Sequence, residues 1–235
     1  MSTLHECIRE LVAEAIARKP AEPKRLADLY SGKTDVPMQR PKFKLNEFKA
    51  LTDVNECLTY ATKTLQELGR GSAREVFRFT GSKVLKVAVN SREGIGQNEA
   101  EFGVFSNPNT TPVVAKIFEH DSSFKWIICE IVKPFERSSV FERETGIPWK
   151  TFHRSVEAGS PSTNIELTDE QFAFLENVIA LIDANELLTG DILDAKHWGK
   201  SADGRVVTLD YGYTQAVDKT HYGADSYDMG EPDEE

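Results

Sequence analysis

Several short segments of this chain carry groups that could bind phosphate and a divalent cation. Gly69 and Gly71 stand close together, Lys86 follows in an apolar run, and Asp191 and Asp210 come later in the chain. Glycine lets the backbone approach a phosphate closely, an ammonium group can neutralise its charge, and carboxylate oxygen suits Mg²⁺. Each segment alone is a weak signal, but their order predicts one site for a phosphorylated ligand.

Lys86 needs a partner, because a lysine in the middle of an apolar strand must either pair its charge or point out of the sheet. The segment from Gly94 to Phe105 is predicted to be a helix and offers two carboxylates. Glu101 is preferred as the partner because it would share a helical face with Phe105, and Glu99 is the fallback. The alternative is that both glutamates are surface charges.

The two aspartates stand at different kinds of position. Asp210 ends the apolar run 205–209 and is followed by Tyr211-Gly212, which places its carboxylate to hold Mg²⁺ beside substrate phosphates. Asp191 follows a predicted helix in the sequence Thr189-Gly190-Asp191, where it could orient an attacking hydroxyl and accept its proton. For each, the alternative is an aspartate that caps a turn.

The elements that must position these groups are predicted from hydrophobic periodicity. Five strands and one helix are expected between Leu65 and Pro134, including a hairpin around Gly81 and a turn after His120. Thr168 and Gln171 form a capping-box pattern that begins a buried helix before Asp191. The strands after the first are expected at 76–79, 83–87, 113–118 and 124–132.

The ends of the chain differ from its centre in composition. Thr3 and Glu6 have the form of a capping box before an amphipathic helix, which could pack on its own domain or dock a partner. The segment Arg18–Lys49 is basic and contains several prolines, so a solvated linker is expected, with contact to an acidic partner or to the chain's own acidic tail as the alternative. Residues after Ala224 carry six acids and no Lys or Arg, which predicts a disordered tail.

Composition excludes several classes of protein. With 235 residues and 40% hydrophobic content, the chain can bury a real core. The net charge of −10 opposes binding to nucleic acid, and no apolar run approaches the ~20 residues that span a bilayer. The start of the chain lacks the pattern of a secretion signal, and Cys7, Cys57 and Cys129 form no ligand pair, so reduced thiols in a soluble cytoplasmic protein are expected.

Residues 65 to 214 resemble protein-kinase-like domains, and their compact form is similar to small kinase-like proteins of tailed bacteriophages. The likeness is carried by Gly69-x-Gly71, Val84-Leu85-Lys86-Val87-Ala88, Gly94-Ile95-Gly96-Gln97-Asn98, Pro112-Val113-Val114-Ala115-Lys116 and Asp210-Tyr211-Gly212. It implies a reduced two-lobed α+β fold. Residues 1–64 would form the N-terminal helix and basic linker, 65–133 a five-stranded antiparallel N-lobe, 134–223 a short, mostly helical C-lobe, and 224–235 the acidic tail.

The resemblance also implies roles for particular residues. The Gly69–Gly71 backbone and Lys86, held by Glu101, would bind the phosphates of ATP, and Asp210 would bind Mg²⁺. Backbone groups of Glu130 and Val132 would pair with the adenine edge, with Cys129 at the back of the pocket. Asp191 would be the catalytic base.

Three departures from the kinase pattern stand out. Arg74 occupies the position of the third glycine, where it could help neutralise a phosphate or be an exposed charge on a hairpin. The asparagine expected five residues after the catalytic aspartate is absent: Lys196 stands there, followed by His197. Only 23 residues follow Gly212, too few for an activation loop and the helices that bind a peptide substrate.

Two functions are compatible with these features. The first is an ATP- and Mg²⁺-dependent phosphotransferase that modifies a hydroxyl of a protein or a small molecule. The second is a pseudokinase that binds or inhibits a host protein, with or without nucleotide. An adenylyl-transferring variant is a third possibility. If the chain is encoded by a phage, the compartment is the host cytoplasm; the sequence assigns no role to residues 136–166 and no oligomeric state.

Overall fold

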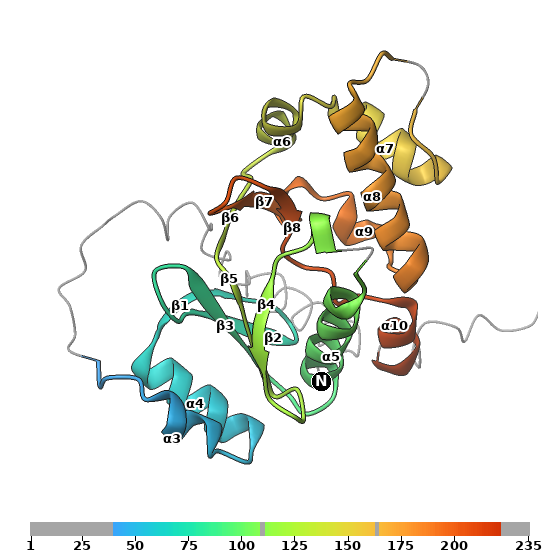
Figure 1. Cartoon of the computed structure of the whole chain (residues 1–235). Helices are drawn as coiled ribbons and strands as arrows, with labels where there is room; N and C mark the ends of the chain where they lie inside the picture. The colour runs from blue at the N-terminus through green and yellow to red at the C-terminus, as the bar shows by residue number, and fades with distance from the viewer. Residues whose placement is uncertain (1–39, 109–110, 163–164, 222–235) are drawn as a thin grey trace, which may run out of the picture. The chain divides into compact units, whose positions relative to one another are not determined.

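The computed structural model describes residues 40–108, 111–162 and 165–221 of the 235-residue chain. The predicted N-terminal helix, most of the basic linker and the acidic tail lie outside these residues. Within the described part, eight α-helices and two antiparallel sheets form an α+β fold (Figure 1). The α+β class predicted from the sequence is therefore confirmed.

The larger sheet has the five antiparallel strands that the sequence predicts, in the order β1-β2-β3-β5-β4. The hairpin around Gly81 joins β2 to β3, and the turn after His120 joins β4 to β5. The strands are β1 (Gln66–Arg70), β2 (Arg74–Arg78), β3 (Lys83–Ala88), β4 (Ile117–His120) and β5 (Trp126–Glu130). The helices that cover the sheet are α3 (Leu45–Lys49), α4 (Val54–Thr64) and α5 (Glu93–Ser106).

The two faces of this sheet have different partners, because successive side chains in a strand point to opposite faces. Leu85 and Val87 of β3 are fully buried in one hydrophobic cluster with residues of α3 and α4. Val84 belongs to a second cluster, with Phe102 of α5 packed against it. Lys86 shares the face of Val84, so β3 directs the lysine toward α5 (Figure 1).

The linker predicted from Arg18 to Lys49 is wrong at its C-terminal end, where α3 forms. Helix α4 follows, in a segment for which the sequence predicts no element. Asp53 caps α4 by accepting hydrogen bonds from the Asn55 and Glu56 N–H groups, a signal that the sequence does carry. Phe48 and Cys57 are completely buried against the sheet. Burial of the Phe48 side chain alone stabilises the fold by roughly 1.5–3 kcal/mol, which explains why this segment is ordered.

The strand predicted at 113–118 begins later than expected. The short 3-10 helix η1 (Thr111–Val113) precedes it, and β4 starts at Ile117. Val114 instead forms a parallel bridge with Thr208 and packs in the core of the second half of the chain. The first part of the strand predicted at 113–118 is wrong, because a buried loop and a buried strand give the same local apolar pattern.

The second half of the described chain packs helices around a small three-stranded sheet with the order β6-β7-β8. Phe141, Phe152 and Trp198 are completely buried at its centre. The elements are β6 (Val132–Pro134), α6 (Ser138–Thr145), α7 (Trp149–Ala158), α8 (Asp169–Asn185), α9 (Thr189–Ile192), η2 (Ala195–His197), β7 (Trp198–Ser201), β8 (Val206–Thr208) and α10 (Gln215–His221).

Two sequence predictions in this half have different outcomes. The capping box of Thr168 and Gln171 is present at the start of α8, as predicted. Pro134 was expected to stop the last strand of the large sheet, and instead it pairs with Gly199 between β6 and β7. The chain therefore leaves the large sheet after Glu130 and enters the small one at Val132.

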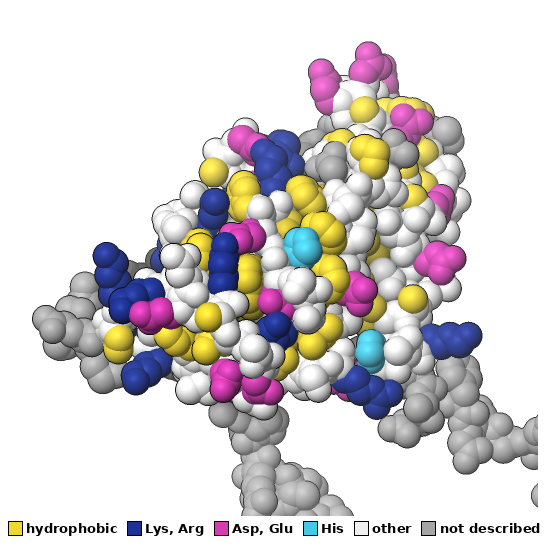
Figure 2. All heavy atoms as spheres, turned by 60° about the horizontal axis from the view of Figure 1, so that its bottom comes forward, with side chains coloured by type: hydrophobic (Ala, Val, Ile, Leu, Met, Phe, Trp, Pro, Cys, Tyr) yellow, Lys and Arg dark blue, Asp and Glu magenta, His cyan; other side chains and the backbone are white. Residues whose placement is uncertain are grey.

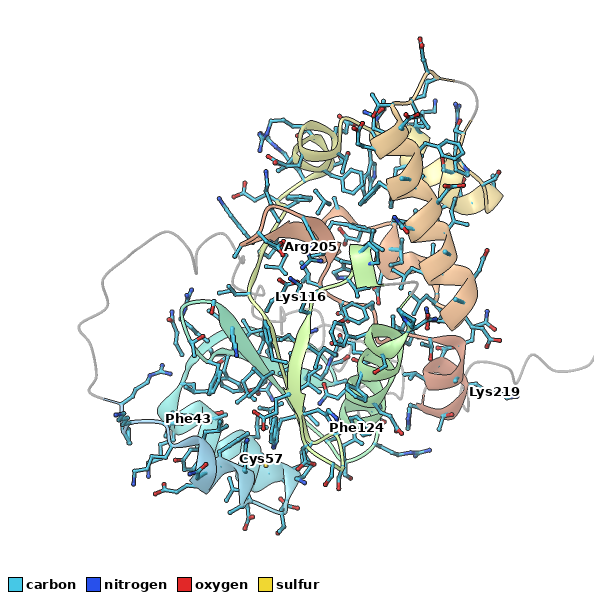
Figure 3. All side chains as sticks on the ribbon, viewed as in Figure 1. Phe43, Cys57, Lys116, Phe124, Arg205 and Lys219 are labelled. Carbon is cyan, nitrogen blue, oxygen red and sulfur yellow. The ribbon has the colours of Figure 1, made fainter. Side chains whose placement is uncertain are left out.

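Charged side chains fix the connection between the two sheets. Arg205 Nη2 donates to Glu130 Oε1 at 2.8 Å, and Lys116 Nζ donates to Asp203 Oδ2 at 2.9 Å. Figure 3 labels Lys116 and Arg205, which lie near each other where the sheets meet. The Lys116 backbone N–H also donates to Glu130 Oε1, at 2.8 Å, so this carboxylate holds the residues that directly precede β4 and β8.

The face drawn in Figure 2 carries basic, acidic and hydrophobic side chains interspersed over its surface. No large patch of a single charge covers it. Among the described residues, the helices are too short or too polar for any of them to cross a membrane.

Candidate functional site

Lys86 and Glu101 form the centre of the candidate site. Lys86 Nζ lies 2.8 Å from both Glu101 carboxylate oxygens and 2.8 Å from the Leu209 carbonyl oxygen. Glu101 is completely buried, whereas Glu99 is exposed on the same helix. The structure thus brings together the pair preferred from the sequence and leaves the fallback on the surface.

Arg74 joins the same cluster from β2. Its Nη1 lies 2.6 Å from Glu101 Oε1, and its Nη2 lies 2.6 Å from Asp210 Oδ1. The side chain is 7% exposed, so the alternative of an exposed charge on a hairpin is wrong. Burial lowers the pKa of Arg74, but attraction to Glu101 and Asp210 outweighs this and the pKa is raised.

Asp210 follows β8 and faces this cluster. Burial raises the pKa of its carboxyl, yet the neighbouring charges of Arg74 and Lys86 outweigh burial and hold the pKa below its usual range. Asp210 is therefore ionised at neutral pH. Two cations and two carboxylates, from residues 74, 86, 101 and 210, form a balanced network.

The segment Asp210-Tyr211-Gly212 is held tightly by its neighbours. The Tyr211 hydroxyl donates to the Ala115 carbonyl oxygen at 2.6 Å. A Cβ added at Gly212 would lie 2.5 Å from the Gln97 carbonyl oxygen of α5. The glycine thus permits the close approach of this segment to the helix that carries Glu101.

Asp191 lies in the short helix α9, near the network but outside its ion pairs. His197 Nδ1 is 3.0 Å from the Asp191 carbonyl oxygen and 3.4 Å from its Oδ1. Burial and then repulsion by Asp210 raise the pKa of Asp191, and His197 partly offsets this. Of the two residues at the place of the missing asparagine, His197 lies beside Asp191, while Lys196 is exposed.

Gly69 and Gly71 lie at the hairpin between β1 and β2. A Cβ added at Gly69 would meet no heavy atom within 4 Å, and at Gly71 the nearest is the Arg74 carbonyl oxygen at 3.7 Å. Neither glycine has a positive φ. The fold alone therefore does not require glycine at either position, and the space beside them is open. The Gly71 N–H already donates to the Arg74 carbonyl oxygen at 2.8 Å.

The segment 130–132 connects the two sheets, where an adenine edge was expected. Glu130 and Ile131 donate their backbone N–H groups to Lys116 and Ser82. The Phe135 N–H donates to the Trp198 carbonyl oxygen across β6 and β7. Hydrogen-bonded and non-hydrogen-bonded pairs alternate along antiparallel strands, so Val132, three residues earlier, belongs to a non-hydrogen-bonded pair. Its N–H and C=O groups therefore point away from β7. Val132 thus offers backbone groups at a sheet edge.

Cys129 lies behind this segment, at the end of β5. The thiol is buried, and burial raises its pKa to about 12. Such a thiol stays protonated and unreactive at neutral pH. Among the described residues, Cys129 and Cys57 form no disulfide, and Cys7 lies outside these residues.

The Mg²⁺ ion that the resemblance implies at Asp210 stays a prediction. The part of the chain that the structure describes contains no group of three or more His, Cys, Asp or Glu that could hold a metal. Mg²⁺ does not require such a group, because one or two carboxylates together with substrate phosphates often hold it. The Arg74 guanidinium occupies Asp210 Oδ1 at 2.6 Å, so a metal on this carboxylate would use Oδ2 or displace the guanidinium.

Sequence reasoning left the contribution of Arg74 open and missed that of the Leu209 carbonyl oxygen. Arg74 stands where the kinase pattern has a glycine, but its partner Asp210 is 136 residues away in sequence. No local pattern therefore predicts their contact. The alternation of side chains along β2 carries a usable signal. Arg74 lies two residues before Val76, so both point to the same face of the sheet. Val76 pairs with Lys86, which therefore shares that face.

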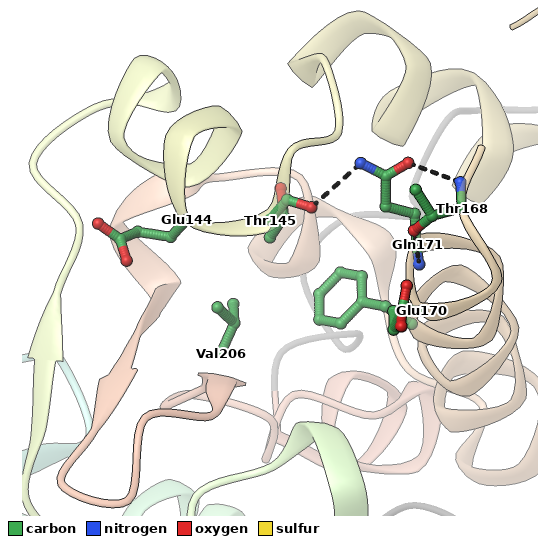
Figure 4. A pocket seen from close by; sticks show the side chains of 7 residues that line it. Glu144, Thr145, Thr168, Glu170, Gln171 and Val206 are labelled. Atoms are coloured by element: carbon green, nitrogen blue, oxygen red, sulfur yellow. Dashed lines mark hydrogen bonds between the residues drawn. The ribbon is translucent and has the colours of Figure 1, made fainter. Parts of the chain in front are cut away.

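A pocket of about 380 Å³ lies elsewhere, between α6 and α8. Figure 4 shows Gln171 linking Thr168 of the cap to Thr145 of α6. None of the predicted site residues lines it. Its lining residues are Glu144, Thr145, Thr168, Glu170, Gln171, Phe174 and Val206.

In comparisons with known proteins, no protein-family model and no curated protein matches this chain.

Proposed function

We propose that this chain is a reduced, two-lobed kinase-like domain that transfers the γ-phosphate of ATP to a hydroxyl group of a protein or a small molecule. The observation that carries the proposal is the buried Lys86–Glu101 pair, which is bonded to the Leu209 carbonyl next to Asp210. A strand lysine, a helix glutamate and a strand-end aspartate thus lie close together, as in kinase-like sites.

In this proposal the large sheet forms the upper lobe and the helices around β6–β8 form the lower lobe. ATP would place its phosphates near Lys86 and the open space beside Gly69 and Gly71. Its adenine would meet the outward backbone groups of Val132, at the connection fixed by Glu130 and Arg205.

Asp191 would act on the acceptor. Its carboxylate takes the proton of the acceptor hydroxyl while that oxygen forms a bond to the γ-phosphorus. The bond from the γ-phosphorus to the β,γ-bridging oxygen breaks, and ADP leaves. The raised pKa of Asp191 favours this role, because a base works best when its pKa lies nearer the operating pH.

A second candidate function is a pseudokinase that binds a host protein. It is favoured by one observation, the guanidinium of Arg74 on the carboxylate expected to hold a metal. A domain of this kind would retain the fold and its nucleotide site but would act by docking rather than by transfer.

Transfer of label from γ-labelled ATP tests these candidates. The full chain is incubated alone and with a bacterial lysate, in Mg²⁺ and in EDTA. Asp191→Asn should abolish labelling, whereas Asp194→Asn should retain it, since that residue caps η2 by accepting from the Lys196 N–H and asparagine can do the same.

Labelling that persists in Asp191→Asn would contradict the assigned base. Absence of label from the folded wild-type chain in both buffers would reject the phosphotransferase and leave the pseudokinase.

A further inference from the structure

Arg74 and Lys86 differ in how many of their donors the cluster uses. The ammonium of Lys86 has three N–H groups, and three oxygens surround it at 2.8 Å. The guanidinium of Arg74 has five N–H groups, and two of them bond to carboxylates of the described residues, at Glu101 and Asp210. Arg74 therefore keeps donors for a further ligand, whereas Lys86 is saturated.

The position of Arg74 relative to the hairpin gives these donors a direction. Arg74 is the first residue of β2, directly after the turn that contains Gly71, and its side chain reaches Asp210 on the far side of the site. The guanidinium thus spans the region between the glycine hairpin and the strand-end aspartate. In the proposed nucleotide site, this is where the phosphates lie.

A divalent cation and Arg74 would share the Asp210 carboxylate. Asp210 Oδ1 accepts the Arg74 bond at 2.6 Å, and a metal on this carboxylate would lie beside a fixed positive charge. Guanidinium binds carboxylate and phosphate through the same planar fork. One group on this chain can therefore donate hydrogen bonds to phosphate while it stays anchored to Asp210 without a metal.

We propose that Arg74 takes the place of a divalent cation at this site, so that the chain binds nucleoside triphosphates without metal. This inference rests on the proposed nucleotide site and deepens it. Asp210 then positions Arg74 rather than a metal ion, and Glu101 holds Arg74 and Lys86 on one carboxylate.

Calorimetric titration of the full-length chain with ATP, in EDTA and in Mg²⁺, tests the inference. The wild-type dissociation constants in the two buffers should agree within about threefold. Arg74→Gly should weaken binding in EDTA by about tenfold or more, since it removes charge-assisted hydrogen bonds to phosphate. Mg²⁺ should restore part of this loss, because Asp210 Oδ1 is released.

Arg143→Gly is the charge-matched control for Arg74→Gly. Arg143 lies on α6, is 68% exposed and pairs with Glu144, so its removal changes the net charge equally without touching the cluster. ATP affinity of this variant should stay within about threefold of wild type in both buffers.

Asp210→Asn separates the two roles of the aspartate and is independent of whether the Arg74 variant folds. If Asp210 positions Arg74, ATP binding in EDTA should persist or become stronger, because the asparagine Oδ1 still accepts the Arg74 hydrogen bond while a negative charge is removed from beside the phosphates. If Asp210 is a metal ligand, binding should require Mg²⁺ in wild type and weaken in this variant.

Binding of ATP by wild type only with Mg²⁺ would overturn the inference and leave the proposed function standing. No binding of ATP by the folded wild-type chain in either buffer would reject the nucleotide site itself, and the inference with it.

Discussion

At the scale of single residues, one buried glutamate holds two cations. Glu101 is completely buried and contacts both Lys86 and Arg74. Removing one member of a buried ion network costs more than the network itself contributes, because the remaining charges stay desolvated and unpaired. Glu101 is therefore the residue whose loss the site tolerates least.

The first prediction follows from this contact. Glu101→Ala should lower the free energy of unfolding by about 3–5 kcal/mol, since it leaves two buried cations without their shared partner. Glu99→Ala, on the exposed side of the same helix, should change it by less than about 0.5 kcal/mol. Urea unfolding followed by circular dichroism measures both, and equal effects would contradict the assignment of Glu101.

The second prediction concerns pH and Asp191. A carboxyl whose pKa is raised in the folded state stabilises the fold below its unfolded pKa of about 3.9, and that stability is lost as the pH rises through the folded pKa. Asp191→Asn should therefore be more stable than wild type at pH 7. The difference should shrink as the pH falls toward 4, which urea titrations at several pH values can follow; a constant difference would reject the shift.

The sequence could predict part of the site at this scale. The apolar surroundings of Lys86 required a partner, and helical spacing favoured Glu101 over Glu99, as the structure places them. The use of Arg74 could not be settled in the same way, because the contact depends on Asp210, which no local pattern links to it.

At the scale of elements, a close approach of backbones sets the position of Asp210. Gly212 lies against α5, where a Cβ would be 2.5 Å from the Gln97 carbonyl oxygen and 2.9 Å from Glu101 Cγ. Since the obstacle includes backbone, it cannot rotate away. The helix that carries Glu101 and the segment that carries Asp210 are therefore fitted to each other.

The third prediction uses this contact. Gly212→Ala should destabilise the protein by about 1–3 kcal/mol and weaken ATP binding, because overpacking displaces α5 or the segment at Asp210. Gly69→Ala is the control for stability, as no atom lies within 4 Å of the added Cβ. Thermal unfolding of both variants gives the comparison, and an unaltered Gly212→Ala protein would show that the contact is looser.

Elements with a regular period or a capping signal were predictable, and others were not. The β2–β3 hairpin, α5 and the capped helix α8 follow such patterns. The late start of β4 and the short strands of the small sheet do not, because β6 and β8 have three residues each and pair with distant segments. Helix α4 buries Cys57 and Ala61, small side chains that give a weak apolar face.

At the scale of the whole molecule, the large sheet depends on residues that precede its first strand. One face of the sheet is covered by α3 and α4, whose residues Phe48, Cys57 and Ala61 are completely buried against Phe77 and Leu85. A chain without these helices would expose that face to water.

The fourth prediction tests this dependence with two truncations. A chain that begins at Leu65 should fail to unfold cooperatively and should aggregate, because one face of its sheet is uncovered. A chain that begins at Pro37 keeps every described element and should unfold cooperatively, with the same midpoint as the full chain. Size-exclusion chromatography and thermal unfolding distinguish the two, and a stable monomer starting at Leu65 would contradict the packing role of α3 and α4.

The contact between Arg74 and Asp210 also has a consequence for how the protein folds. It closes a loop of 136 residues. Closing such a long loop costs conformational entropy of the chain before the contact can contribute to stability. The hairpin and the helices can form from neighbouring residues, but this contact waits for nearly all of the described chain. During refolding, the ATP binding that we propose should therefore recover last, after the far-ultraviolet signal of the helices has returned.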